Sequence, residues 1–155
     1  MEQPILFQVH NLIQTKPAIP RVNERIASMI KIMLVDDQVI VRRGLRMRLA
    51  LEPDLEIIGE ASNGREALDL SQKLIPDVIV MDIEMPELDG ISASQMLRDS
   101  MPDCSVIILT LHDDAQNRSR AIASGAKAFI SKQGGATVLI DTIRKIRPDL
   151  LTENF

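Results

Sequence analysis

The sequence predicts an α/β protein built on a doubly wound, five-stranded parallel sheet with helices on both faces. From Lys31 onward, short apolar runs of strand length alternate five times with longer amphipathic stretches of helical period. The apolar runs are nearly uninterrupted, which is typical of strands buried on both faces. The stretches between them are long enough to be helical crossovers, and such crossovers connect parallel strands with a right-handed turn.

The apolar runs predict five strands. The first is a continuous run of Ile, Met, Leu and Val that ends in an acidic pair, and the third and fourth are runs of the same kind. Each is bounded by polar or turn-forming residues, as strands are. The expected strands are residues 32–35, 55–60, 78–81, 106–109 and 128–130.

Apolar residues at helical spacing predict a helix after each strand. In the first, Val41, Leu45 and Leu49 recur once per turn, and Pro76 ends the second. Gly90 marks a turn before the third. The expected helices fall within residues 41–49, 67–74, 91–97, 115–124 and 137–146.

One folded domain accounts for most of the 155 residues. The first thirty contain three prolines and no long periodic stretch, so we expect an N-terminal arm over residues 1–30. The regular alternation assigns the domain to residues 31–147. Residues 148–155 remain as a C-terminal tail or as the start of a linker.

Composition excludes several classes of function. Three Phe and no Trp or Tyr disfavour single-strand nucleic-acid binding, which relies on aromatic stacking. The chain carries 18 Lys and Arg against 22 Asp and Glu, so it lacks the broad basic surface that duplex DNA requires. A single cysteine, Cys104, cannot form an intramolecular disulfide or a cysteine zinc site, which favours a reducing cytoplasm. No apolar run approaches the roughly 18 residues of a membrane span, and no signal peptide is evident.

Five polar residues lie at or just past the ends of expected strands. They are Asp36, Asp37, Asp82, Thr110 and Lys132. The carboxyl ends of parallel strands meet at one edge of an open sheet, and ligands bind beyond that edge. We therefore expect three carboxylates, one hydroxyl and one ammonium in a single cleft.

This combination of groups indicates phosphoryl chemistry. Three neighbouring carboxylates repel one another unless a cation compensates, and oxygen ligands without His or Cys favour Mg²⁺. The metal and Lys132 would neutralise charge on the phosphoryl oxygens. We expect Asp82, alone at its strand end, to be the nucleophile, and the pair Asp36 and Asp37 to hold the metal.

Several separated motifs contain the residues at the strand ends. They are the acidic pair in MLVDD (33–37), DIEMPELDG (82–90), ILT (108–110) and GAKAFISK (125–132), with a spacing of three between Phe129 and Lys132. With these motifs the chain resembles the receiver domain of two-component response regulators, over about residues 31–147. Two further stretches, VDDQVIVRRGL at residues 35–45 and EASNGREA at residues 60–67, are similar to the NarL/LuxR-type subfamily.

The resemblance implies a flavodoxin-like fold with strand order 2-1-3-4-5 and a role for each site residue. A histidine kinase would transfer phosphate to Asp82. Mg²⁺ would bind through Asp37, Asp82 and the backbone carbonyl of Glu84, with Asp36 assisting. Lys132 would pair with the phosphoryl group. The switch residues would be Thr110, moving to hydrogen-bond that group, and Phe129, swinging inward behind it.

The resemblance also implies partners. The protein would be a phosphoacceptor that assists its own phosphorylation and dephosphorylation rather than an enzyme acting on other substrates. NarL/LuxR-type regulators continue into a helix-turn-helix domain, so DNA would be bound only through chain that lies beyond residue 155. A phosphorylation-dependent homodimer is a further expectation, and no membrane contact is expected.

Two other functions remain open at this point. A phosphatase of haloacid-dehalogenase type also uses an aspartyl phosphate and Mg²⁺, but it needs a second Asp two residues after the nucleophile, where this chain has Glu84. Its nucleophile also follows the first strand, whereas Asp82 follows the third. The other alternative is an interaction module that works without phosphorylation.

Some residues near the expected cleft have weaker assignments. Glu84, two places after Asp82, and His112, two places after Thr110, are candidate modulators of metal and phosphate binding.

The first helix carries four arginines that we expect to form a solvated face, with kinase docking as their functional use. These arginines are Arg42, Arg43, Arg46 and Arg48.

Overall fold

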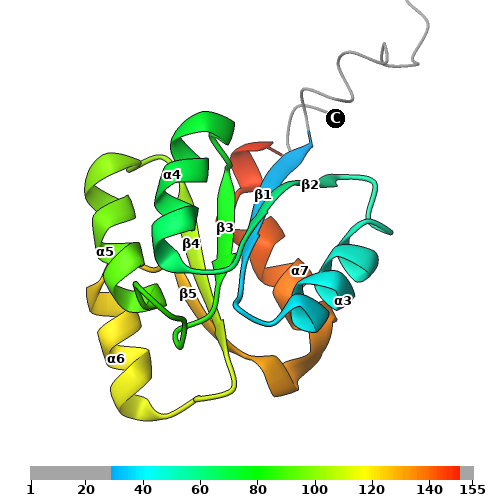
Figure 1. Cartoon of the computed structure of the whole chain (residues 1–155). Coiled ribbons are helices and arrows are strands. Elements are labelled where there is room, and N and C mark those ends of the chain that lie inside the picture. The colour runs from blue at the N-terminus through cyan, green and yellow to red at the C-terminus, as the bar shows by residue number, and fades with distance from the viewer. Residues whose placement is uncertain (1–28, 151–155) are drawn as a thin grey trace, which may run out of the picture.

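A five-stranded sheet with all strands parallel forms the centre of the molecule. The computed structural model describes residues 29–150 (Figure 1). The strand order is β2-β1-β3-β4-β5, which confirms the predicted fold class and order. The strands are β1 (Ile30–Val35), β2 (Leu55–Ala61), β3 (Val78–Met81), β4 (Ser105–Thr110) and β5 (Ala128–Ser131).

Helices cover both faces of the sheet, as predicted. Helices α4, α5 and α6 pack on one face, and α3 and α7 pack on the other (Figure 1). A short 3₁₀ turn, η1 (Lys132–Gly134), precedes α7, and η2 (Pro148–Leu150) follows it. The helices are α3 (Val39–Leu49), α4 (Gly64–Leu74), α5 (Gly90–Ser100), α6 (Ala115–Ala123) and α7 (Gly135–Ile146).

Alternate residues of each strand belong to two separate cores. In β1, Met33 and Val35 pack beneath α4 and α5, whereas Ile32 and Leu34 pack beneath α3 and α7. Strand side chains point to opposite faces in turn, so a strand covered on both faces needs apolar residues at every position. This double burial is why the strand sequences are continuous apolar runs.

Three helices begin at residues whose side chains cap the helix N-terminus. Asn63, Asp89 and Asp114 each accept a hydrogen bond from a backbone N–H in the first turn of the following helix. Such caps satisfy amide groups that have no partner within the helix. They hold the starts of α4, α5 and α6 beside the loops that follow the strands.

The sheet begins earlier than the sequence pattern indicated. Ile30 is fully buried, pairs with Leu55 of β2 and donates its N–H to the carbonyl of Asp54. The polar side chain of Lys31 interrupts the apolar run but is exposed, and the backbone continues through it. Ile30 therefore belongs to β1 rather than to the expected arm, whose residues 1–28 lie outside the described part of the chain.

No helix within residues 29–150 combines the length and the apolar character that crossing a membrane requires.

Two glycines provide a test of close packing at the start of α5. A Cβ on Gly90 would lie 1.9 Å from the carbonyl oxygen of Asp82, whereas a Cβ on Gly44 in α3 would meet nothing within 4 Å. We expect Gly90→Ala to lower the free energy of unfolding by about 2 kcal/mol or more. Gly44→Ala should raise it by about 0.5–1 kcal/mol, because alanine is the better helix former.

Urea unfolding of both variants checks this expectation. Equal effects of the two substitutions would contradict the packing of Gly90 against the backbone of Asp82.

Candidate functional site

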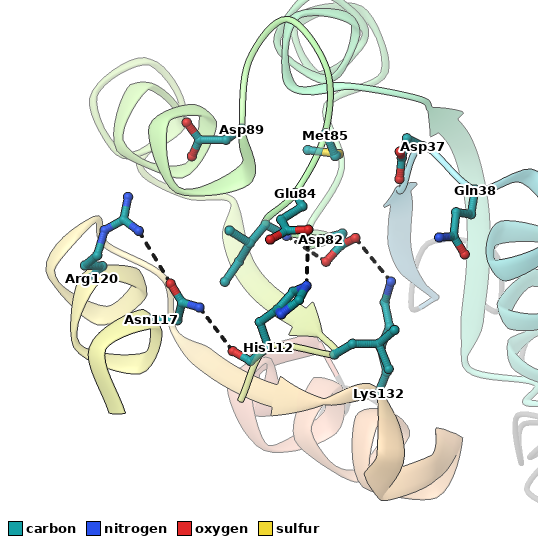
Figure 2. A pocket seen from close by; sticks show the side chains of 12 residues that line it. Asp37, Gln38, Asp82, Glu84, Met85, Asp89, His112, Asn117, Arg120 and Lys132 are labelled. Carbon is teal, nitrogen blue, oxygen red and sulfur yellow. Dashed lines mark hydrogen bonds and ion pairs between the residues drawn. The ribbon is translucent and has the colours of Figure 1, made fainter. Parts of the chain in front are cut away.

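A cavity of about 610 Å³ opens at the edge where the strands end, which is the lower edge of the sheet in Figure 1. Its lining comes from the loops after β1, β3 and β4, from α6, and from the turn after β5 (Figure 2). Open parallel sheets bind ligands at this edge. The charged and polar lining includes Asp37, Asp82, Glu84, His112, Asn117 and Lys132.

Lys132 joins two carboxylates that come from different strands. Its Nζ lies 2.6 Å from Oδ2 of Asp36, after β1, and 3.2 Å from Oδ2 of Asp82, after β3. All three side chains are at most 12% exposed. The other oxygen of Asp82 accepts a hydrogen bond of 2.8 Å from the backbone N–H of Ile83. Both oxygens of Asp82 are therefore held in place.

The three predicted acidic residues converge. One carboxylate oxygen from each of Asp36, Asp37 and Asp82 lies within 4.8 Å of the other two. The set contains only hard oxygen donors and is partly open to solvent through Asp37, which is exposed. Mg²⁺ prefers such ligands and usually keeps several waters, so these residues fit that ion.

Burial and charge act against each other at the carboxyl of Asp82. Burial is the main cause that raises the pKa of Asp82 above its ordinary value, and the charge of Asp36 adds to the increase, while Lys132 opposes it. For Lys132, burial lowers the pKa, but the bond to Asp36 and the charge of Asp82 outweigh it, so the pKa is raised. The ammonium therefore stays charged, while the ionised form of Asp82 is disfavoured until more positive charge is supplied.

Thr110 and Phe129 are buried, and neither lines the cavity. The hydroxyl of Thr110 accepts a hydrogen bond of 3.1 Å from the N–H of His112. Phe129 packs in the core beneath α4, α5 and α6, and the guanidinium carbon of Arg118 lies 4.9 Å from its ring centroid. The two residues thus lie in the interior and not at the cavity wall.

Glu84 and His112, which the sequence marked separately, form one pair. The carboxylate of Glu84 lies 3.1 Å from Nε2 of His112, and both side chains are more than half exposed (Figure 2). The contact closes part of the rim above Asp82. Sequence reasoning placed each residue near the cleft but could not show that they meet, because they lie on different loops.

Two further lining residues were not predicted. Asn117 donates to the carbonyl of His112 at 3.3 Å, and Arg120 donates to the side chain of Asn117 at 3.4 Å (Figure 2). Both lie on α6, directly after the loop that follows Thr110. Their position just after the end of β4 could have predicted them, because the loops that follow parallel strands all lie at the same edge of the sheet.

The expectation of a solvated arginine face is wrong for Arg42. Its side chain is 15% exposed and turns toward the loop after β1. Arg46 and Arg48 pair with Glu60 and Glu52, so they are not free charges either.

Cys104 lies directly before β4, and burial raises the pKa of its thiol to about 12, which keeps it protonated.

An open parallel sheet of this strand order defines the flavodoxin-like class of α/β proteins, which bind ligands beyond the carboxyl ends of their strands. Within that class, the response regulator receiver domain matches residues 32–144. The chain belongs to this family, whose members are signalling domains rather than classical enzymes. The match does not favour a phosphatase of haloacid-dehalogenase type.

Similar proteins place the chain among LuxR/NarL-type response regulators. It is 40% identical to the transcriptional regulatory protein LiaR of Bacillus subtilis over 116 residues, 75% of this chain and 55% of that protein. It is 34% identical to the transcriptional regulatory protein DegU of Brevibacillus brevis over 117 residues, 76% of this chain and 50% of that protein. The chain therefore spans about half the length of the curated relatives it matches.

Solved structures agree with this assignment. The receiver domain of the putative response regulator NarL from Mycobacterium tuberculosis superposes with a TM-score of 0.70 at 27% identity, covering 75% of this chain and 97% of that one. A LuxR-family DNA-binding response regulator from Staphylococcus aureus gives 0.73 at 26% identity, covering 76% and 98%.

The raised pKa of Asp82 predicts how stability responds to its removal. Without Mg²⁺ at pH 7, we expect Asp82→Asn to melt a few degrees above the wild type, because ionised Asp82 disfavours the folded state. Below the ordinary pKa of 3.8 both side chains are neutral, so the difference should vanish as the pH falls. Thermal melts between pH 3 and 7.5 measure this, and a variant less stable than the wild type at every pH contradicts it.

Proposed function

We propose that this domain is the phosphoacceptor of a two-component signalling system, in which Asp82 takes a phosphoryl group from the phosphohistidine of a histidine kinase. One observation carries the proposal. The Lys132 ammonium bridges Asp36 and Asp82 at the wall of an acidic cavity, and this occurs in a chain of the receiver family.

The arrangement suits in-line transfer. A carboxylate oxygen of Asp82 forms the new bond to phosphorus while the bond from phosphorus to the donor nitrogen breaks. The donor histidine carries a proton on its other ring nitrogen and therefore leaves as neutral imidazole. Lys132 neutralises part of the charge on the phosphoryl oxygens. Mg²⁺ held by Asp37, Asp82 and the carbonyl of Glu84, with Asp36 assisting, would supply further positive charge to the same oxygens.

Phosphorylation changes the balance of partners around Lys132. The phosphoryl group brings nearly two negative charges and strong acceptor oxygens into a site where Lys132 is already shared between Asp36 and Asp82. We expect Lys132 to turn from Asp36 toward the phosphoryl group. The local change is electrostatic, and a two-state element is needed to carry it to the surface.

Thr110 and the loop after it form that element in our proposal. The O–H of Thr110 would donate to the phosphoryl group while its oxygen still accepts from the N–H of His112, so a shift of Thr110 would carry the loop with it. The carbonyl of His112 is bonded to Asn117 of α6, so movement of the loop reaches that helix. Phe129 would follow Thr110 inward, and Glu84 and His112 at the rim would modulate loss of phosphate.

The output of the switch is transcription control through chain outside this domain. The relatives it matches are transcriptional regulatory proteins about twice as long as the matched segment. DNA would be contacted by a helix-turn-helix domain following this one. A phosphorylation-dependent homodimer and a cytoplasmic location complete the proposal.

The first helix offers a docking face for the kinase. A groove of about 390 Å³ runs between α3 and α7, with an apolar lining that includes Val41, Leu45 and Leu139. It shares Gln38, Leu111 and Lys132 with the acidic cavity, so it opens beside the reacting carboxyl. A kinase helix bearing the phosphohistidine would bury this apolar surface as it presents phosphorus to the cavity.

Replacing the acceptor tests the central proposal. Asp82→Asn should take up less than about 1% of the wild-type label from acetyl phosphate with Mg²⁺, because an amide is a far weaker nucleophile. EDTA should abolish labelling of the wild type. Asp89→Asn is the matched control, because Asp89 lines the same cavity but caps α5, and it should label normally. Wild-type labelling of Asp82→Asn would overturn the acceptor assignment.

An exposed residue beside the groove tests kinase docking. Ile40 is 79% exposed on α3, so Ile40→Asp should leave the fold intact. We expect transfer from a phosphorylated histidine kinase to slow about tenfold, the loss of one good interface contact, with no change in labelling by acetyl phosphate. Ile75→Asp, 66% exposed at the end of α4, is the control. Equal slowing by both variants argues against this face.

A further inference from the structure

Arg42 is a largely inward-turned arginine, 15% exposed, that no step of the proposed phosphoryl transfer uses. It lies in the first turn of α3, and its side chain passes inward behind the acidic pair instead of pointing to solvent. One guanidinium nitrogen donates a hydrogen bond to the backbone carbonyl of Asp36. The Nε atom lies 3.6 Å from a carboxylate oxygen of Glu60 on β2, and it is buried without a hydrogen bond.

The contact completes a set of bonds that holds every polar group of Asp36. Its N–H donates to the carbonyl of Ala61, one carboxylate oxygen accepts from the N–H of Gln38, and the other accepts from Lys132. Arg42 supplies the remaining partner, on the carbonyl. Asp36 is therefore tied to β2, to its own loop, to the turn after β5 and to α3.

The carbonyl that Arg42 binds belongs to the peptide unit that joins Asp36 to Asp37. A peptide unit is planar, so fixing its carbonyl direction also fixes the position of the next Cα. Asp37 is exposed, and its side chain extends from the Cα that this peptide unit places. A bond behind Asp36 thus controls the placement of both carboxylates in front.

We propose that Arg42 is a positioning residue for Mg²⁺, because its hydrogen bond to the Asp36 carbonyl holds the Asp36–Asp37 peptide unit in the orientation that points both carboxylates at the cation. The inference rests on the proposed function, because it assumes that these carboxylates hold the metal. Groups that orient metal ligands from behind commonly change metal affinity by 10–100-fold when removed.

Charge alone would have the opposite effect. A guanidinium near a cation site repels the cation, so removing its charge should tighten Mg²⁺ binding if charge were the whole contribution. Geometry predicts weaker binding. The sign of the change in affinity therefore separates the two explanations.

Arg46 supplies a matched control. It lies one turn further along α3 and also pairs with Glu60, but within residues 29–150 it forms no hydrogen bond or ion pair with Asp36 and does not line the cavity. Arg42→Met and Arg46→Met remove the same charge from the same partner and keep an unbranched apolar side chain. They differ in the bond to the Asp36 carbonyl.

The experiment is a Mg²⁺ titration of the full chain, followed by calorimetry or by amide NMR shifts at fixed ionic strength. We expect Arg42→Met to raise the dissociation constant about tenfold and Arg46→Met to leave it within about twofold. Arg42→Lys, which retains one donor but not the fork, should fall between Arg42→Met and the wild type. At saturating Mg²⁺, Arg42→Met should be labelled by acetyl phosphate at close to the wild-type rate.

A second readout does not depend on the metal. In the metal-free protein, the carbonyl ¹³C shift of Asp36 should change in Arg42→Met and not in Arg46→Met, since only the first loses the hydrogen bond. Unchanged or tighter Mg²⁺ binding by folded Arg42→Met overturns the inference, as does an equal loss in both variants. A wild type that binds no Mg²⁺ would instead overturn the proposed function itself, which distinguishes the two failures.

Discussion

The ion pairs of Lys132 with Asp36 and Asp82 are the constraint on which the rest of the site depends. Lys132 follows β5, the edge strand, while the two carboxylates follow β1 and β3 near the middle of the sheet. One ammonium therefore links the ends of three strands. Without it, two largely buried carboxylates would face each other without compensating charge, which is costly in a region of low dielectric constant.

The ammonium of Lys132 compensates the negative charge of the two carboxylates only in part, which suits a site that binds a further cation. Burial holds the pKa of Asp82 above its ordinary value despite the nearby ammonium. A divalent cation would compensate the remaining negative charge of the cluster, and it would also offset the negative charge of the phosphoryl group. The backbone around Asp82 is correspondingly rigid, because Gly90 packs against its carbonyl and Ile83 holds one of its oxygens. The carboxylate of Asp82 is therefore held in place before any cation binds.

Most of the fold and the main site residues could be predicted because they depend on local pattern. Continuous apolar runs indicated strands buried on both faces. Polar residues at the ends of these runs indicated the edge of the sheet where ligands bind. The arginines of α3 show what a local pattern could not predict, which is the direction of a long side chain. Periodicity assigned Arg42 to the outer face, but a long side chain in the first helical turn can reach back to the preceding loop. Likewise, the contact between Glu84 and His112 joins two loops whose relative path no periodicity describes.

The sequence by itself determined the class of fold, the family and the residue types gathered at the strand ends. The fold class follows from continuous apolar runs that alternate with stretches of helical period, and the family follows from the motifs. The gathering at the strand ends follows from the common direction of parallel strands. Only the tertiary structure decided which charges pair. Lys132 meets Asp36 across 96 positions of sequence, and Arg42 turns inward while Arg43 stays exposed. Pairing depends on distances of a few ångströms between side chains on different elements, and those distances are set by how the elements pack.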